Sequence, residues 1–291
     1  MSQQLKSIFT ALFLITVVMS TSFAKPQETN WPKIYKEEFF HITEVMVTDV
    51  ASPPVAARIY AYTNLAAYLV IKSQGAEFQN KDLLEHSYLS SHDWEIRSEK
   101  VQSPEFAAVL AFLKVGKAIM PSGYLLEEKQ SEWIQKAIKA KIISKKTLQA
   151  HIDLATEIAV KVMDVAKKDG YLQLSTLTRY TPQKGEGFWY PTPPAYIAAV
   201  EPEWKTIKPF YIQNLEDYKP APMAPFDMKE GSSFHTQLME VYNTTNELNE
   251  ERKLIANFWD CNPFKVEFSG HMAIGVKKIS PGGHWIGITG I

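Results

Sequence analysis

Apolar residues recur three or four positions apart along most of the chain, the spacing that places them on one face of an α-helix. Ser52 and Ser103 each precede a proline, where a serine can cap a helix that proline begins, and Gly170 can end the longest apolar stripe. The pattern predicts helices over residues 32–50, 53–73, 104–120, 124–140, 144–169, 232–243 and 245–259, the last opened by a capping box at residues 244–247. Because no stretch alternates clearly with period two, we predict an all-α helical bundle.

The helical pattern is interrupted between Tyr171 and Pro225, where prolines and aromatic residues crowd together. Chains that cannot fold are poor in aromatic residues, so this segment is predicted to be ordered. The structural interpretation is a long, irregular, proline-stiffened arm whose Trp and Tyr side chains are pressed into grooves between helices. A functional alternative is an aromatic cleft that binds a sugar or a peptide.

The N-terminus has the features of a secretory signal peptide. An apolar stretch, residues 8–19, is followed by the small residues that signal peptidase requires, with cleavage expected before Lys25. The stretch is too short to span a bilayer, and no later apolar run in the sequence is long enough to do so. We therefore predict a signal peptide over residues 1–24 and an exported mature region, residues 25–291, that is periplasmic or secreted.

Charge and composition exclude some classes of function. The formal net charge is −1 at pH 7 and the arginines stand singly, so no basic stripe indicates nucleic-acid binding. The single cysteine, Cys261, cannot form an internal disulfide. We interpret it as a small packing residue and not as a nucleophile.

Several short motifs, taken in order, carry a resemblance to a known superfamily. They are the run Val47 to Tyr62, Tyr180-Thr181-Pro182 with Gly185 and Trp189, Pro191-Thr192-Pro193-Pro194 with Tyr196, Trp204, Pro209-Phe210, and Phe258-Trp259 followed by Gly283-His284-Trp285. Their order and spacing resemble a secreted bacterial branch of the vanadium-dependent haloperoxidase and type 2 phosphatidic acid phosphatase superfamily, over nearly the whole mature chain. The resemblance implies a helical-bundle fold and, in complete members, a site that binds phosphate or vanadate.

That superfamily's site is built from three motifs in order: a Lys followed by Arg-Pro, then Pro-Ser-Gly-His, then Ser-Arg with a later His. No arginine of this sequence precedes a proline or follows a serine. Ser269-Gly270-His271 matches three letters of the middle motif, but Phe268 stands where the proline belongs. We therefore assign no catalytic, cofactor-binding or metal-binding residue. Gly283-His284-Trp285 fits better as a structural segment, and both histidines are interpreted as loop residues that hydrogen-bond backbone groups beside a packed Trp.

These observations predict the N-terminal portion of an exported acid phosphatase or vanadium haloperoxidase-like protein, inactive by itself and without a vanadate or phosphate site of its own. The stretch 286–291 is apolar and punctuated by glycines, which suggests a chain that stops before its catalytic residues. A missing C-terminal catalytic half is expected to pack on this region. Phosphatase is the preferred activity of the complete protein because it needs no scarce cofactor, and the oligomeric state is left open.

Two alternatives belong to other classes. Glu38 and His41 have the Glu-x-x-His spacing of di-metal helical bundles, although no second such pair occurs; the simpler interpretation is a solvated Glu38 and a surface His41. The second alternative is a non-catalytic exported binding or assembly module that docks through its aromatic arm. His86 and His92 have no cysteine nearby and do not indicate zinc.

Overall fold

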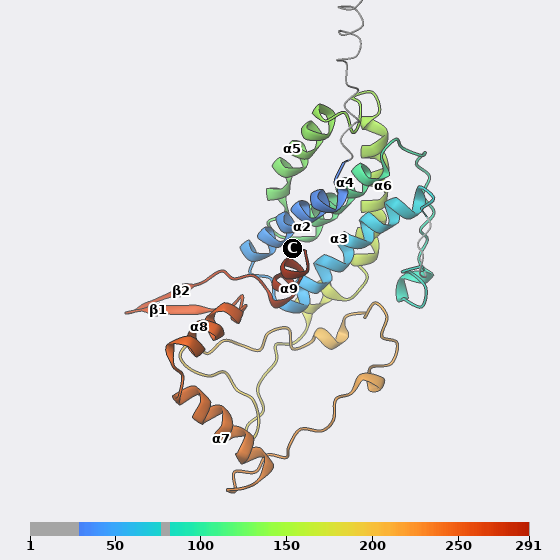
Figure 1. Cartoon of the computed structure of the whole chain (residues 1–291). Coiled ribbons are helices and arrows are strands. Elements are labelled where there is room, and N and C mark those ends of the chain that lie inside the picture. The colour runs from blue at the N-terminus through green and yellow to red at the C-terminus, as the bar shows by residue number, and fades with distance from the viewer. Residues whose placement is uncertain (1–28, 77–81, 291) are drawn as a thin grey trace, which may run out of the picture. The chain divides into compact units, whose positions relative to one another are not determined.

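The computed structural model describes residues 29–76 and 82–290 of the chain (Figure 1). The predicted signal peptide, residues 1–24, lies outside the described residues. Contacts within the chain divide it between Ile34 and Tyr35, and the core of the bundle, the arm and the C-terminal elements belong to the unit that begins at Tyr35. Within the described part of the chain, no helix combines the length and the apolar character needed to cross a membrane.

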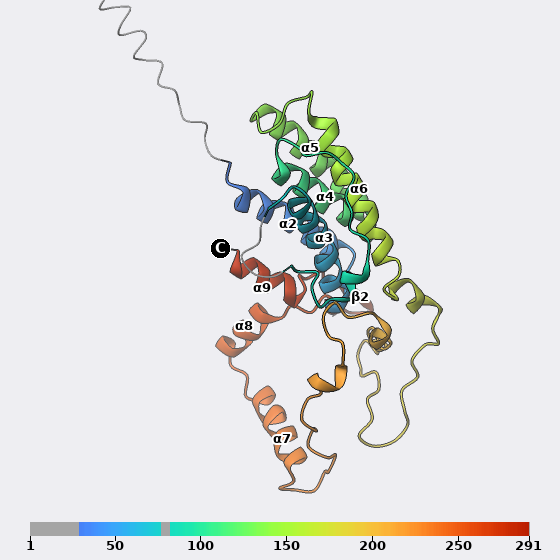
Figure 2. The same ribbon diagram turned by 90° about the vertical axis from the view of Figure 1, so that its right-hand side faces the viewer.

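The prediction of an all-α bundle is confirmed. In the described part of the chain the bundle consists of α2 (Trp31–Thr48), α3 (Pro53–Ser73), α4 (Pro104–Ile119), α5 (Leu126–Lys139) and α6 (Leu148–Ala166). Helices α3, α4 and α6 each contact the other two, and α4 also contacts α5 (Figure 2). Helix α4 is apolar on all sides, and between Phe106 and Gly116 all of its residues except Lys114 are buried. A helix of this kind has to be enclosed by others, so α4 forms the centre of the core.

A glycine lets α2 approach α4 closely. A Cβ added at Gly116 would lie 2.2 Å from Cδ1 of Ile42, which is fully buried. Phe39 of the same helix stacks on Phe112 with ring centroids 6.0 Å apart. The side chains of α2 therefore fill the space that Gly116 leaves open on α4.

Serine caps begin two of the helices as the sequence predicts. The hydroxyls of Ser52 and Ser103 accept hydrogen bonds from the backbone N–H groups of Val55 and Phe106. Helix α6 begins four residues later than predicted, at Leu148, because residues 144–147 form a separate hydrogen-bonded turn.

The boundary between the last two predicted helices is wrong. Helix α7 (Ser233–Asn246) runs into the expected capping box at residues 244–247, with Glu247 as its C-cap, and α8 (Glu250–Trp259) begins later. The side chain of Asn249 accepts a hydrogen bond of 2.8 Å from the backbone N–H of Arg252 and so caps α8. In the described structure no residue of α7 or α8 is buried.

The sequence pattern did not reveal one short hairpin beside the helices of the described structure. Strands β1 (Val266–Ser269) and β2 (Met272–Gly275) form an antiparallel hairpin in which Val266 pairs with Gly275 and Ser269 with Met272. Each strand has 4 residues, too few for alternation to be recognised against the helical background.

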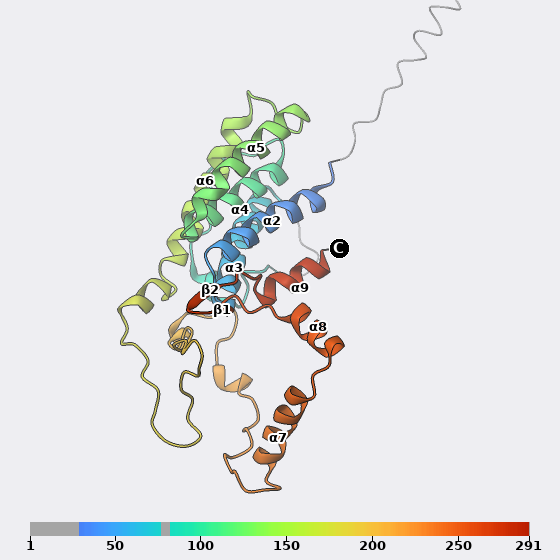
Figure 3. The ribbon, with the colours of Figure 1, turned by 90° about the vertical axis from the view of Figure 1, so that its left-hand side faces the viewer.

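A further helix, α9 (Pro281–Thr289), was not predicted, and it lies beside α3 (Figure 3). It begins with Ser280, whose hydroxyl accepts from the N–H of Gly283. A Cβ added at Gly283 would lie 3.0 Å from the hydroxyl of Tyr60, and one at Gly287 would lie 3.4 Å from the ring of Phe40. The glycines of this segment therefore allow a close approach to the bundle.

The arm has the predicted irregular backbone, but only part of it packs as predicted. Phe188, Trp189 and Tyr190 are 49%, 47% and 63% exposed, so they do not fill grooves between helices. Further along, Phe210 lies edge-on to Tyr62 of α3 with centroids 5.2 Å apart. Short 3₁₀ helices connect these elements: η1 (Tyr88–Ser91), η2 (Gly123–Leu125), η3 (Tyr171–Thr176), η4 (Trp204–Thr206) and η5 (Leu215–Tyr218).

Candidate functional site

The three-letter match Ser269-Gly270-His271 forms the turn of the β1–β2 hairpin. Gly270 has φ of +59°, which glycine adopts without strain, and all three residues are exposed. The nearby lysine, Lys265, is engaged in ion pairs with Glu267 at 3.3 Å and Asp260 at 3.8 Å. In the described structure the turn presents His271 to solvent and does not join it to a group of cationic side chains.

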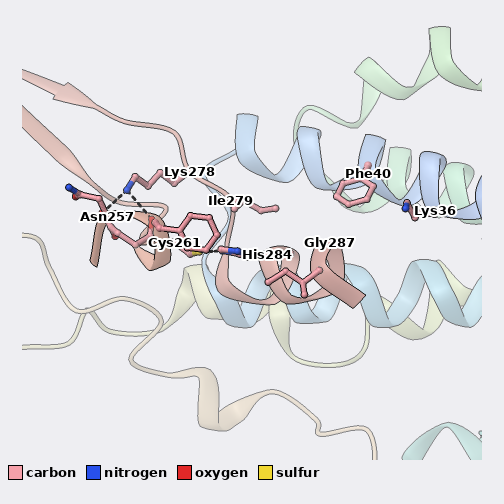
Figure 4. Close-up of a pocket in the computed structure, with 12 residues that line it drawn as sticks. Lys36, Phe40, Asn257, Cys261, Lys278, Ile279, His284 and Gly287 are labelled. Atoms are coloured by element: carbon pink, nitrogen blue, oxygen red, sulfur yellow. Dashed lines mark hydrogen bonds and ion pairs between the residues drawn. The ribbon is translucent and has the colours of Figure 1, made fainter. Parts of the chain in front are cut away.

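The second histidine, His284, lies instead in the wall of a cavity of about 510 Å³ (Figure 4). Helices α2, α8 and α9 and the segments next to them contribute its lining, which consists of Lys36, Phe40, Asn257, Phe258, Asp260, Cys261, Lys278, Ile279, Gly283, His284, Gly287 and Ile288. The volume is in the range of small-molecule sites, which are mostly apolar with a few placed polar groups.

Cys261 and His284 form a direct contact that the sequence interpretation missed. The Sγ of Cys261 lies 2.8 Å from Nδ1 of His284, and the imidazole stacks on Trp259 with centroids 5.2 Å apart. His284 thus packs beside a Trp as expected, but the partner of its imidazole is a thiol and not a backbone group. Activated thiols generally have an imidazole oriented by a third polar group, and within the described residues no such group contacts Nε2 of His284.

The two lysines of the cavity are both engaged. Lys278 donates to the carboxylate of Asp260 at 2.6 Å and to its carbonyl oxygen at 2.9 Å, and Lys36 donates to the carbonyl oxygen of Gly290. The hydrogen bond from Lys278 lowers the pKa of Asp260 below its ordinary value. The cavity therefore offers apolar walls and internally satisfied charges.

Replacing Lys278 by methionine is expected to raise the pKa of Asp260 toward its ordinary value of 3.8, because the strongest bond to the carboxylate is lost. In the native protein this pKa is lower in the folded than in the unfolded chain. The contribution to stability is therefore present above the ordinary pKa and is lost as the pH falls through the folded one. An NMR titration of the Asp260 carboxyl carbon measures the change. Lys265→Met is the matched control with a smaller expected effect, and an unchanged pKa in Lys278→Met would contradict the assignment.

The Glu-x-x-His pair is arranged differently from the expected surface pair. Glu38 is only 6% exposed, and its carboxylate lies 2.9 Å from Nδ1 of His41. The expectation of a solvated Glu38 is therefore wrong, because α2 turns this position toward the core and His41 supplies the partner that a buried carboxylate needs. Among the described residues, no group of three or more His, Cys, Asp and Glu side chains is placed to hold a metal ion.

The remaining candidate histidines, His86 and His92, do not form a common site. His86 is exposed with its Nε2 3.6 Å from Glu85. His92 packs edge-on against Tyr88, with centroids 5.7 Å apart.

A buried polar network joins α3 to the start of the arm, and the sequence interpretation did not find it. Arg58 and Asp169 are 6% and 1% exposed, and Nε of Arg58 donates to Oδ2 of Asp169 at 2.6 Å. Arg58 also donates to the carbonyl oxygen of Ala166 at 2.8 Å. Tyr62 donates to the same carboxylate at 3.1 Å, and burial raises the pKa of its hydroxyl.

Two signals in the sequence could have located missed features. Ser280-Pro281 repeats the Ser-Pro start of α3 and α4, and it marks the beginning of α9. Arg58 stands within the apolar positions of α3, so a buried partner was required. The identity of that partner, 111 positions away, does not follow from local pattern.

Comparisons with known proteins place this fold. No protein-family model matches the sequence, and no curated protein sequence matches it. Among solved structures, the chain is similar to a bacterial vanadium-dependent iodoperoxidase, with a TM-score of 0.75 and 30% sequence identity over 88% of this chain. The match spans 60% of the iodoperoxidase chain. The resemblance predicted from the order of short motifs is therefore confirmed.

Proposed function

We propose that this chain, which is similar to a vanadium-dependent iodoperoxidase in fold and sequence, is the N-terminal helical portion of an exported enzyme of the vanadium-dependent haloperoxidase and type 2 phosphatidic acid phosphatase superfamily. We also propose that its own residues do not form the anion-binding site. One observation supports the proposal that these residues do not form the anion-binding site. Ser269-Gly270-His271, the only segment that matches a superfamily site motif, lies in an exposed hairpin turn among the described residues.

The residues present do not fit a vanadate or phosphate ion. Such an anion is held by several free cationic donors and a cradle of backbone amides. In the cavity of His284, Lys278 is committed to Asp260 and Lys36 to a backbone carbonyl. Arginine, the residue that binds these oxyanions in a bidentate manner, does not line this cavity. We therefore derive no catalytic step through vanadate or phosphate in this region.

The role we propose for this region is to support a catalytic portion that packs on it. The supporting observation is an apolar surface, here called the α8–α9 surface, formed by Leu254, Ile255, Phe258, Trp259, Trp285 and Ile288. Their side chains are 70%, 52%, 63%, 47%, 57% and 39% exposed. The rings of Trp259 and Trp285 stack with centroids 5.4 Å apart. Exposed apolar surface of this kind generally marks a contact with another protein surface.

For the complete protein, we prefer peroxide-dependent halide oxidation to phosphoester hydrolysis as the proposed activity. Sequence reasoning preferred a phosphatase, but the iodoperoxidase is similar over 88% of this chain at 30% identity. Neither activity is expected from these residues alone.

The test is an activity assay on the purified mature chain, residues 25–291. We expect no turnover above background of a generic phosphomonoester, and none of iodide with hydrogen peroxide in the presence of added vanadate. His271→Ala is the matched variant, because His271 is exposed and its loss leaves the fold intact. Clear turnover of either substrate that disappears in His271→Ala would contradict the proposal.

A second candidate, a non-catalytic binding or assembly module, is favoured by the exposed aromatic side chains of Phe188, Trp189 and Tyr190 in the arm. Flat aromatic side chains at the surface are suited to recognising a partner. A stable module of this kind should be monodisperse in solution, whereas an uncovered α8–α9 surface predicts self-association.

A further inference from the structure

A second cavity, of about 430 Å³, lies between α3 and the second half of the arm, and it shares no lining residue with the cavity of His284. Ala57 and Ala61 of α3 form one wall, and Trp204 and Phe210 of the arm form the other. Most of its lining is apolar. A cavity of this volume and lining has the properties of a small-molecule site.

One side of this cavity is formed by an ion pair whose two members are already hydrogen-bonded to each other. Arg58 and Asp169 both line it, and each is satisfied by the other and by neighbouring groups. Arg58 donates to a backbone carbonyl, and its guanidinium lies 4.4 Å from the ring centre of Tyr171. Asp169 accepts from the backbone N–H of Tyr171 at 2.9 Å. This side of the cavity is thus polar and rigid, and it leaves no uncompensated charge for a ligand to neutralise.

The aromatic walls are held in place by contacts outside the cavity. Trp204 lies edge-on to Tyr171 with centroids 6.0 Å apart. Phe210 packs on Tyr62 at 5.2 Å and on Tyr88 at 5.7 Å, and its carbonyl oxygen accepts from the N–H of Tyr88 at 3.1 Å. These rings do not have to be ordered when a ligand arrives, which reduces the entropic cost of binding.

Lysines give the cavity a positive charge at its exposed side. Lys205 and Lys208 both line it and both are exposed. Lys205 lies 3.5 Å from the carboxylate of Glu203. Lys208 is fixed through its backbone N–H, which donates to the carbonyl oxygen of Asp169 at 2.8 Å. Its ammonium has no carboxylate partner among the described residues, so one cation remains available.

We propose that this cavity binds a small, flat, apolar molecule that carries one carboxylate or a similar anionic group. The ring system lies against Ala57 and the aromatic walls, where burial of apolar area drives binding. The anionic group lies at the exposed side and accepts hydrogen bonds from the ammonium of Lys208. The inference is independent of the proposed function, because it uses neither the α8–α9 surface nor an anion-binding active site.

The test measures binding of two probes of equal shape to protein expressed from the full reading frame. 1-Naphthoate carries the anion, and 1-naphthalenemethanol presents the same rings without charge. Isothermal titration calorimetry should show one saturable site for naphthoate and at least about tenfold weaker binding of the alcohol. Ala57→Trp, a change at an exposed helix position, should fill the cavity and abolish binding. Lys208→Glu should weaken naphthoate binding at least about tenfold and leave the alcohol unchanged.

Matched controls separate this cavity from other apolar surfaces. Ala150→Trp places the same bulk at an exposed position of α6, and Lys145→Glu makes the same charge change at an exposed lysine; neither residue lines the cavity. Both should bind naphthoate as the native protein does. The proposal is overturned if naphthoate shows no saturable binding at millimolar concentration, if Ala57→Trp binds normally, or if binding is lost only in Leu254→Glu on the α8–α9 surface.

Discussion

Replacing Asp169 by alanine is expected to lower the free energy of unfolding by about 3–5 kcal/mol, because it leaves the guanidinium of Arg58 buried without its counter-ion. Arg58 is 6% exposed, so little of its surface can exchange the lost carboxylate for water. The same change removes the acceptors of Tyr62 and of the backbone N–H of Tyr171. Urea unfolding followed by circular dichroism measures the loss.

Two further variants test the cause of this effect. Asp93→Ala removes an exposed carboxylate that lies 3.4 Å from Lys161, and it should lower the free energy of unfolding far less than Asp169→Ala does. A double variant, Arg58→Met with Asp169→Leu, replaces the ion pair by apolar groups and should recover much of the lost stability. A loss below about 1 kcal/mol in Asp169→Ala would show that water reaches Arg58 and that the pair is not an isolated buried charge.

The chain in solution is expected to self-associate through the α8–α9 surface. Its net charge of −1 provides little repulsion between copies, and the side chains of Leu254 and Phe258 are 70% and 63% exposed. Leu254→Glu should shift the protein from oligomers to monomer in size-exclusion chromatography with light scattering. Burying a carboxylate in an apolar contact is costly unless it finds a partner.

The control for this prediction is Val160→Glu, which changes a side chain that is 55% exposed on α6 without a similar apolar surface around it. It should leave the distribution of species unchanged. A native protein that is monomeric and monodisperse across the accessible concentration range would contradict the prediction, and it would favour the binding-module alternative over an uncovered contact surface.

Local signals predicted the bundle well. Serine caps at Ser52 and Ser103 and the stripes of apolar residues are determined within a few residues, so the starts and faces of α3 and α4 follow from the sequence. The capping box at 244–247 was misassigned because Asn249, a competing cap, lies within one turn of it. The choice between two such neighbouring caps depends on packing that local pattern does not contain.

The contacts that build the two cavities could not be predicted in the same way. Cys261 meets His284 across 23 positions and Arg58 meets Asp169 across 111, and a single sequence carries no signal for which pair forms. The extent to which the aromatic side chains of the arm pack against the helices was overestimated for a related reason. Its composition indicates order, but which aromatic side chains reach the bundle depends on where the chain is held. The arm is tied to α3 near Phe210 and through Glu201, which accepts from the hydroxyl of Ser52 at 3.1 Å, whereas Trp189 stays exposed.

A backbone hydrogen bond at Asp169 closes the first part of the arm into a loop. The chain leaves the bundle there, and the N–H of Lys208 returns to the carbonyl oxygen of the same residue. The segment between them is therefore an excursion whose two ends meet, as in an Ω-loop, although it is longer than most. Because the ends are fixed together, insertions or deletions between Thr178 and Val200 can change the outline of the arm without moving α6 or the residues after Lys208. Related chains can therefore have a longer or shorter loop here, or one with different side chains, while the helices of the bundle keep their arrangement.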